Sequence, residues 1–170
     1  MLNAQTYARL GTVTAARGLD RAEQHAWHEV LWATRLLFDA LDRQLQHDAG
    51  MPHAYYLILA ALSGQPDHTM TMGELARAVR SSPSRLSHAV ARMETAGWVR
   101  RGRDPHHRRH TYAHLTGAGL RALTAAAPGH VAAVRRHLFD RLSAAQVDAL
   151  REACAAVRAG LEPAAGASPR

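Results

Sequence analysis

The chain has 170 residues, a length typical of one domain or of a compact core with one appendage. Its 47% apolar and 21% charged residues allow a hydrophobic core and argue against disorder throughout the chain. The formal net charge is +7, all of its basic residues are arginine, and the single cysteine excludes an internal disulfide framework and a four-cysteine zinc site within one chain.

Hydropathy gives no indication of a membrane segment or of export. The longest uninterrupted apolar run, residues 54–62, is far shorter than the roughly 20 residues that a membrane-spanning helix needs. The first twenty residues lack the continuous apolar region of a signal peptide. These features predict a soluble cytoplasmic protein with no membrane partner.

The positive charge is concentrated in one segment. Residues 77–109 contain nine arginines and two acids, Glu94 and Asp104, whereas arginines and acids balance in the rest of the chain. A concentrated excess of this kind indicates a binding surface for a polyanion. The alternative is a basic face that is simply solvated.

In chain order, the first predicted element is a long helix. Residues 1–19 show no clear period and are expected to form a loosely ordered arm. Asp20 is a good N-cap, and apolar residues recur from there at three- and four-residue steps as far as Gly50. This helix of about 30 residues would be about 40 Å long. A second helix, with Pro52 at its first position, is expected to end at Gly64.

Two short helices are predicted next. Thr71 and Glu74 have the spacing of a capping box, which starts the first of them. Ser82 followed by Pro83 starts the second, over residues 82–96. Its predicted inward stripe consists of Leu86, Val90 and Met93.

Two β-like segments, residues 98–101 and 111–115, flank a polar loop and predict a hairpin with a long basic tip. The order of short helix, short turn, second helix and hairpin is that of a winged helix-turn-helix. The predicted fold class is therefore mainly α with a small β-hairpin wing, joined to long N- and C-terminal helices.

Two further helices are expected after the hairpin. Thr116 caps the first, which Pro128 should kink or interrupt. Ser143 and Gln146 form a second capping box, from which the last helix runs to Gly160. The small residues and prolines of 163–170 predict a disordered tail.

The helix over 82–96 has a polar face opposite its inward stripe, and an α-helix fits the major groove of DNA. Arg85 could pair bidentately with guanine, and His88 could contact a base edge or a phosphate. The residues expected at the major groove are Ser82, Ser84, Arg85, His88 and Arg92. The alternative is a helix surface exposed to water.

The arginine-rich hairpin tip suits a narrow minor groove, whose negative potential attracts guanidinium groups. The residues expected there are Arg103, Arg108 and Arg109. An ordinary solvated loop is the alternative.

The outer helices, residues 20–49 and 143–160, carry more apolar surface than a small lobe can cover. They predict a homodimer whose recognition helices lie about 34 Å apart on a palindromic site. The helical dimerisation region would comprise residues 20–50 and 116–162, and the DNA-binding domain residues 51–115. A monomer with a self-packed bundle is the alternative.

Other kinds of site are disfavoured. The twelve histidines lack a metal-ligand spacing, so no metal site and no cofactor are predicted. Cys154 is expected to be a small buried hydrophobe in the stripe of the last helix. No catalytic order of residues, phosphate loop or carboxylate pair indicates an enzyme.

The stretch from Thr71 to Leu120 resembles the MarR (multiple antibiotic resistance regulator) family of winged-helix transcription factors. The similar features are MGELARAV, SSPSRLSHAVARMETAGWVRR and RDPHHRRHTYAHLTGAG, which match the helix-turn-helix, the wing and the start of the next helix. The flanking helices are similar in order and length, so the resemblance extends over about residues 20–160.

The resemblance implies a homodimeric regulator, more often a repressor than an activator, that leaves DNA when a ligand changes the separation of its lobes. It places Arg109 on the wing arginine that enters the minor groove, with Arg108 alongside. The family commonly has Asp where this chain has His107, so the orientation of Arg109 is left open.

The resemblance also suggests a pocket for a small aromatic effector. Aromatic residues that could line it are Trp27, Trp32, Phe38, Tyr55 and Tyr56. Their helical spacing favours the simpler interpretation that they belong to the core. Two rival functions remain, a sequence-tolerant architectural DNA-binding protein and a winged-helix module for protein interaction, although the arginine-dense wing argues against the latter.

Overall fold

The structure, a computed structural model, describes residues 18–103 and 111–162; of Arg103 it describes the strand position alone. The chain forms two compact units, Met1–Leu36 and Leu37–Arg170, whose boundary lies within the first described helix. In the described ranges, no helix is long and apolar enough to cross a membrane.

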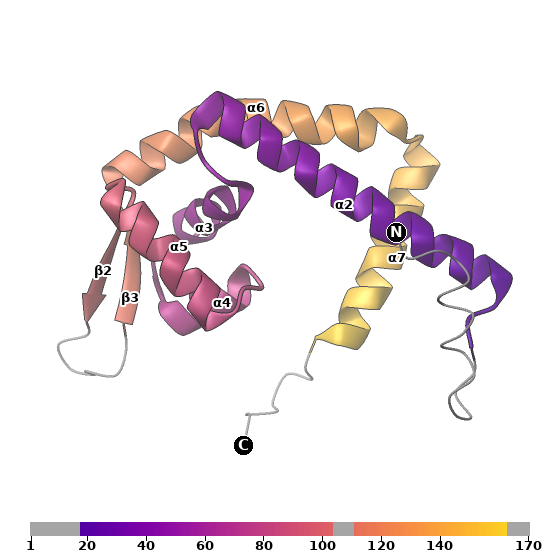
Figure 1. Cartoon of the computed structure of the whole chain (residues 1–170), viewed down its shortest axis with the longest axis horizontal. Coiled ribbons are helices and arrows are strands. Elements are labelled where there is room, and N and C mark those ends of the chain that lie inside the picture. The colour runs from indigo at the N-terminus through magenta and orange to yellow at the C-terminus, as the bar shows by residue number, and fades with distance from the viewer. Residues whose placement is uncertain (1–17, 104–110, 163–170) are drawn as a thin grey trace, which may run out of the picture. The chain divides into compact units, whose positions relative to one another are not determined.

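The helical elements that precede the wing are α2 (Arg21–Ala49), α3 (His53–Ser63), α4 (Met72–Ala78) and α5 (Pro83–Thr95) (Figure 1). Their starts follow the predicted capping signals. At the start of α2, the backbone N–H of Asp20 donates to the Glu23 carboxylate and that of Glu23 to the Asp20 carboxylate. Thr71 and Glu74 form a complete capping box on α4, and Ser82 caps α5. At α3 the prediction is wrong by one position, because Pro52 is the N-cap and the helix begins at His53.

The wing consists of β2 (Val99–Arg103) and β3 (Thr111–Leu115), which pair in antiparallel register from Val99 opposite Leu115 to Arg103 opposite Thr111. Among the described residues, a further strand, β1 (Thr69–Thr71), completes a sheet in the order β1-β3-β2. No strand is predicted there from the sequence. Three residues are too few to show a period, and β1 becomes a strand only because β3 offers it an edge.

The remaining elements are α6 (Gly117–His137), a 3-10 helix at Phe139–Arg141, and α7 (Ala144–Leu161). Of the kink or interruption predicted at Pro128, the interruption is wrong, since α6 continues through it. Proline removes one intrahelical hydrogen bond, and α6 extends for more than two turns on each side of it.

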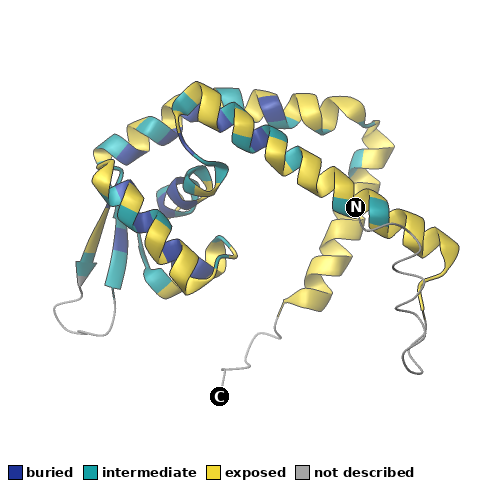
Figure 2. Cartoon of the chain, in the orientation of Figure 1, coloured by how far each residue is buried: buried dark blue, intermediate teal, exposed yellow. Residues whose placement is uncertain are grey.

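The core lies between α3, α4, α5, the sheet and the N-terminal half of α6 (Figure 2). The inward stripe of α5 is buried as predicted, together with residues that the other elements contribute. These include Leu45, Met51, Ile58, Leu59, Leu62, Leu75, Val99, Ala113 and Leu123.

The outer helices differ from this core. No residue of α7 is buried, and Cys154 is exposed, which overturns its predicted burial. Trp27, Trp32 and Phe38 are also exposed by about half, at 44%, 57% and 50%, so their assignment to the core is wrong for the single chain. Helical spacing identifies an apolar stripe but does not say whether the same chain covers it.

Candidate nucleic-acid interface

The candidate recognition helix, α5, is fixed to the core by one face. Leu86, Val90 and Met93 are 1%, 0% and 0% exposed. At its N-terminus the Ser82 hydroxyl accepts a hydrogen bond from the backbone N–H of Arg85, 3.3 Å away. The rotation of α5 about its own axis is therefore determined by apolar burial, and its start by a local cap.

The opposite face of α5 is exposed and basic. It presents the predicted major-groove set to solvent: Ser82, Ser84, Arg85, His88 and Arg92. Within the part of the chain that the structure describes, neither Arg85 nor Arg92 forms an ion pair, so both guanidinium groups can bind an external anion. Ser82 keeps a hydroxyl hydrogen to donate while its oxygen caps the helix.

The turn that precedes α5 has a residue in the left-handed region. Arg80 has φ +51°, an uncommon conformation for a residue other than glycine. Its guanidinium lies 3.1 Å from a carboxylate oxygen of Glu162, which follows α7. Of the nine arginines in the basic segment, Arg80 is thus one whose charge is partly offset within the chain.

The predicted wing residues are only partly placed. Arg103 ends β2 opposite Thr111, whereas Arg108, Arg109 and His107 lie outside the described residues. The base of the wing is described fully, and it carries Arg100 and Arg101 on adjacent positions of β2.

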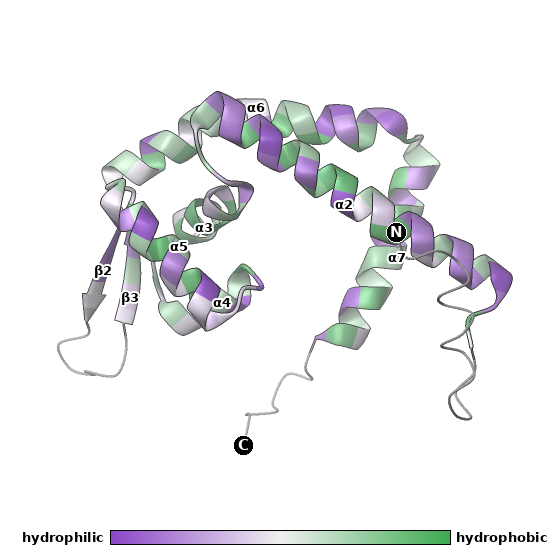
Figure 3. Cartoon of the chain, viewed as in Figure 1, coloured by the Kyte–Doolittle hydropathy of each residue, from purple (hydrophilic) through white to green (hydrophobic). Residues whose placement is uncertain are grey.

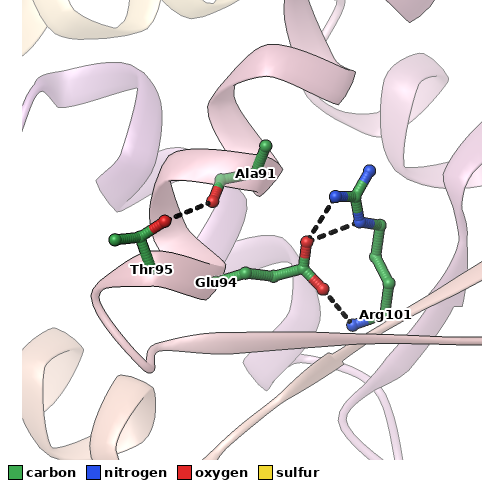
Figure 4. Close-up of polar contacts among 4 residues, drawn as sticks. All are labelled: Ala91, Glu94, Thr95 and Arg101. Carbon is green, nitrogen blue, oxygen red and sulfur yellow. Dashed lines mark hydrogen bonds and ion pairs between the residues drawn. The ribbon is translucent and has the colours of Figure 1, made fainter.

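Arg101 is held by Glu94, an acid in the last turn of α5 (Figure 4). Its backbone N–H donates to one carboxylate oxygen of Glu94 at 2.9 Å, and its Nε donates to the other at 2.6 Å. These side-chain hydrogen bonds hold the pKa of the Glu94 carboxyl below its ordinary value. Both residues enter the charge balance of the basic segment, but their pairing is not predicted from the sequence. Their separation of seven residues across a glycine turn gives no simple periodic signal.

The outward face of the sheet has a polar cluster at its base. The Thr69 hydroxyl and Nδ1 of His114 lie 2.7 Å apart, which joins β1 to β3. A side chain at Gly102 would come within 3.1 Å of the His114 ring, so glycine lets the ring lie across β2. Burial, together with the charge of Arg100, lowers the pKa of His114.

The sequence also raises two other kinds of site, a metal site and a pocket lined by aromatic residues. No group of histidine, cysteine and carboxylate side chains among the described residues could hold a metal ion. Tyr55 lines an open groove of about 380 Å³ together with Gln46, Pro52, Arg92 and Thr95. Tyr56 packs instead against His130, with ring centroids 4.3 Å apart.

Comparison with known proteins places these features in one family. A sequence profile described as MarR family matches residues 49–110. No curated protein sequence matches the chain.

Two solved structures from Streptomyces coelicolor are similar over most of their length. Sco3205, a MarR family transcriptional regulator in complex with DNA, is 47% identical, with a TM-score of 0.84 over 88% of this chain and 94% of its own. AbsC, another MarR family transcriptional regulator, is 40% identical, with a TM-score of 0.80 over 86% and 98%. A mutant MarR from E. coli complexed with operator DNA is 18% identical and shares the fold, with a TM-score of 0.68 over 76% and 91%.

Proposed function

Since the chain belongs to the MarR family of DNA-binding transcriptional regulators, which are not enzymes, we propose that it is a homodimeric repressor that reads a pseudo-palindromic operator. The observation that carries the proposal is that α5 has an exposed, basic face opposite the apolar stripe that is buried in the core. The DNA complex of Sco3205, at 47% identity, supports the same use of this fold.

In this proposal α5 enters the major groove. Arg85 pairs with a guanine, His88 contacts a base edge or phosphate, and Arg92 contacts the flank of the groove. Ser82 and Ser84 donate to phosphate at the positive end of the helix. The wing, with Arg103, Arg108 and Arg109, lies along the minor groove.

The dimer would form through residues 20–50 and 116–162, and residues 51–115 would bind DNA. The exposed apolar side chains of α2 and α7 support this division, because their burial against a second copy would release water from them. A regulator of this kind acts where DNA lies, and we expect it in the cytoplasm.

Repression would follow from occlusion of a promoter. A small aromatic effector would relieve it only if that effector binds the DNA-free arrangement of the lobes more tightly than the DNA-bound one. Tyr55, which lines the groove formed with Gln46, Pro52, Arg92 and Thr95, is the aromatic residue we propose for contact with such a molecule.

The test is selection of duplex DNA from a random library, followed by fluorescence anisotropy on the selected and a scrambled duplex across a salt series. A preference of about 10³-fold or more with a steep salt dependence is expected of a specific regulator. Equal binding to both duplexes would favour the architectural alternative. Absence of binding at low salt would leave the protein-interaction module.

A further inference from the structure

Glu94 is an acid in the last turn of α5, near the negative end of the helix dipole, where a carboxylate is unfavourable by itself. The arginines around it in the sequence act in the opposite direction, and one of them contacts it directly. Figure 4 shows it: both carboxylate oxygens of Glu94 face Arg101 across the turn.

The contact adds a polar restraint between α5 and β2, whose residues Met93 and Val99 already share the buried core. Between α5 and β2 the backbone passes through Gly97, which has φ +74° and open space where a side chain would be. Glu94 spans that turn with a backbone hydrogen bond of 2.9 Å, a side-chain hydrogen bond of 2.6 Å and an ion pair of 2.5 Å. Both guanidinium contacts end on the same carboxylate oxygen, Oε2, while Oε1 accepts from the backbone N–H of Arg101, so the carboxylate is held by the side chain and the backbone of one residue.

A second brace acts on the same turn from the other side. The Thr116 hydroxyl lies 2.6 Å from the carbonyl oxygen of Gly97 and 3.1 Å from that of Trp98. Because β2 pairs with β3 along its whole length, any rotation of β2 about Gly97 carries the wing with it. Glu94 and Arg101 restrain that rotation directly from the recognition helix.

We propose that Glu94 is a positioning residue, whose ion pair with Arg101 sets the angle of the wing relative to α5 so that both reach the same DNA site. Arg101 then acts within the protein and does not contact phosphate. The inference rests on the proposed DNA-binding function and adds to it two residues that the expected contact set did not contain.

Because the pair is partly exposed, its positioning role can be measured apart from an effect on folding stability. The Arg101 and Glu94 side chains are 36% and 28% exposed, and ion pairs so close to solvent contribute little to folding. Variants of either residue are therefore expected to fold, with melting temperatures close to that of the unaltered protein.

The test compares two variants that change the net charge in opposite directions, Glu94→Gln and Arg101→Gln. The probe is the duplex selected from a random library by the unaltered protein, with its scrambled form as the non-specific duplex. If the pair positions the wing, both variants lower the ratio of specific to non-specific affinity by about tenfold, the usual scale for one charged hydrogen bond. The salt dependence of binding stays unchanged in Arg101→Gln, because no phosphate contact is lost.

Arg100→Gln is the matched control. It removes the same charge from the adjacent residue of β2, opposite His114 rather than Glu94, so it is expected to leave the specificity ratio unchanged. Arg101→Lys keeps the charge and loses the planar guanidinium group. It should recover part of the ratio of specific to non-specific affinity that Arg101→Gln loses.

The proposal is overturned if the two variants shift affinity in opposite directions, as charge alone would require. It is also overturned if the ratio of specific to non-specific affinity is unchanged in either variant. It is also overturned if specific and non-specific affinity fall together with the melting temperature, since the pair would then act on folding. If the unaltered protein prefers no selected duplex, the proposed function itself fails and the inference fails with it.

Discussion

Two histidine rings and two other aromatic rings meet where α2, α3 and α6 come together. The ring centroids of Phe38 and His53 lie 5.6 Å apart, those of His53 and His130 5.4 Å, and those of Tyr56 and His130 4.3 Å. Nδ1 of His130 is buried without a hydrogen-bond partner among the described residues. These surroundings therefore favour the neutral form of the two histidine rings.

The same surroundings determine how the two histidines titrate. Burial lowers the pKa of His53, although the charge of Asp42 works in the opposite direction. Burial also lowers the pKa of His130, and the nearby charge of His53 lowers it further. Both groups thus bind protons less readily in the folded chain than in the unfolded one, where a histidine titrates near pH 6.5.

We expect the free energy of unfolding to decrease as the pH falls from about 7 to 5, since the unfolded chain takes up more protons in this range. The measurement is chemical denaturation at a series of pH values. His130→Gln should flatten the dependence, while His137→Gln, at an exposed position at the end of the same helix, should not. An equal slope in all three proteins would contradict the assignment.

Substitution of Arg85 tests its proposed contact with a base. Its guanidinium is exposed and without an ion-pair partner among the described residues, so Arg85→Ala should leave stability nearly unchanged. We expect a loss of about 1–3 kcal/mol in binding to the selected duplex and a relaxed preference at one base pair. Binding measured on a panel of single-base substitutions would show this, and an equal loss on every duplex would exclude base readout by Arg85.

At the scale of the element, the start of α6 lies against the turn that follows α5. A Cβ atom at Gly119 would lie 2.1 Å from the carbonyl oxygen of Trp98, which is backbone and cannot move aside cheaply. The Thr116 hydroxyl accepts from the backbone N–H of Gly119 at 3.0 Å in the same place. Glycine at this position therefore allows the helix and the turn to pack closely.

We expect Gly119→Ala to destabilise the protein by about 2 kcal/mol, because the overpacking exceeds the gain in helix propensity. Gly117→Ala is the matched control within the same helix turn, since its Cβ would meet only the flexible end of Arg121, 3.5 Å away. Thermal or chemical denaturation of the two variants measures the difference. Equal stability of both would show that the turn can shift to admit a methyl group.

At the scale of the whole molecule, the outer helices present apolar side chains to solvent. On α7, Leu150, Val157 and Leu161 are 38%, 63% and 78% exposed, and their spacing places them on one side of the helix. Figure 3 shows hydrophobic residues along α7, where Figure 2 shows exposure. An unpaired apolar face of this kind favours association of two chains.

The corresponding prediction concerns the oligomeric state. The double variant Leu150→Asp, Val157→Asp should shift the mass measured by sedimentation from dimer to monomer and abolish binding to a two-fold symmetric duplex. Ala159→Asp adds a charge on the other side of α7 and should leave the dimer intact. A dimer in all variants would exclude α7 from the interface.

Local sequence patterns alone predicted the order of the α-helices from α2 to α7, the hairpin between α5 and α6, and the face of α5 that is buried. N-caps at Ser82, Thr71 and Ser143 act within four residues, and the inward stripe of α5 repeats at helical spacing, so local chemistry specifies them. The arginine-rich segment was visible in the same way, because charge density along a chain does not depend on the fold.

Which of these residues come into contact depends on the tertiary structure. β1 exists because β3 provides an edge, α6 continues through Pro128, and the stripe that holds Cys154 stays exposed because no described part of the single chain covers it. The pairing of Glu94 with Arg101 depends on how the chain turns at Gly97, and with the pairing of Arg80 and Glu162 it occupies two arginines of the basic segment within the chain. Contacts of this kind depend on distances across a turn or between elements, which composition and spacing do not encode.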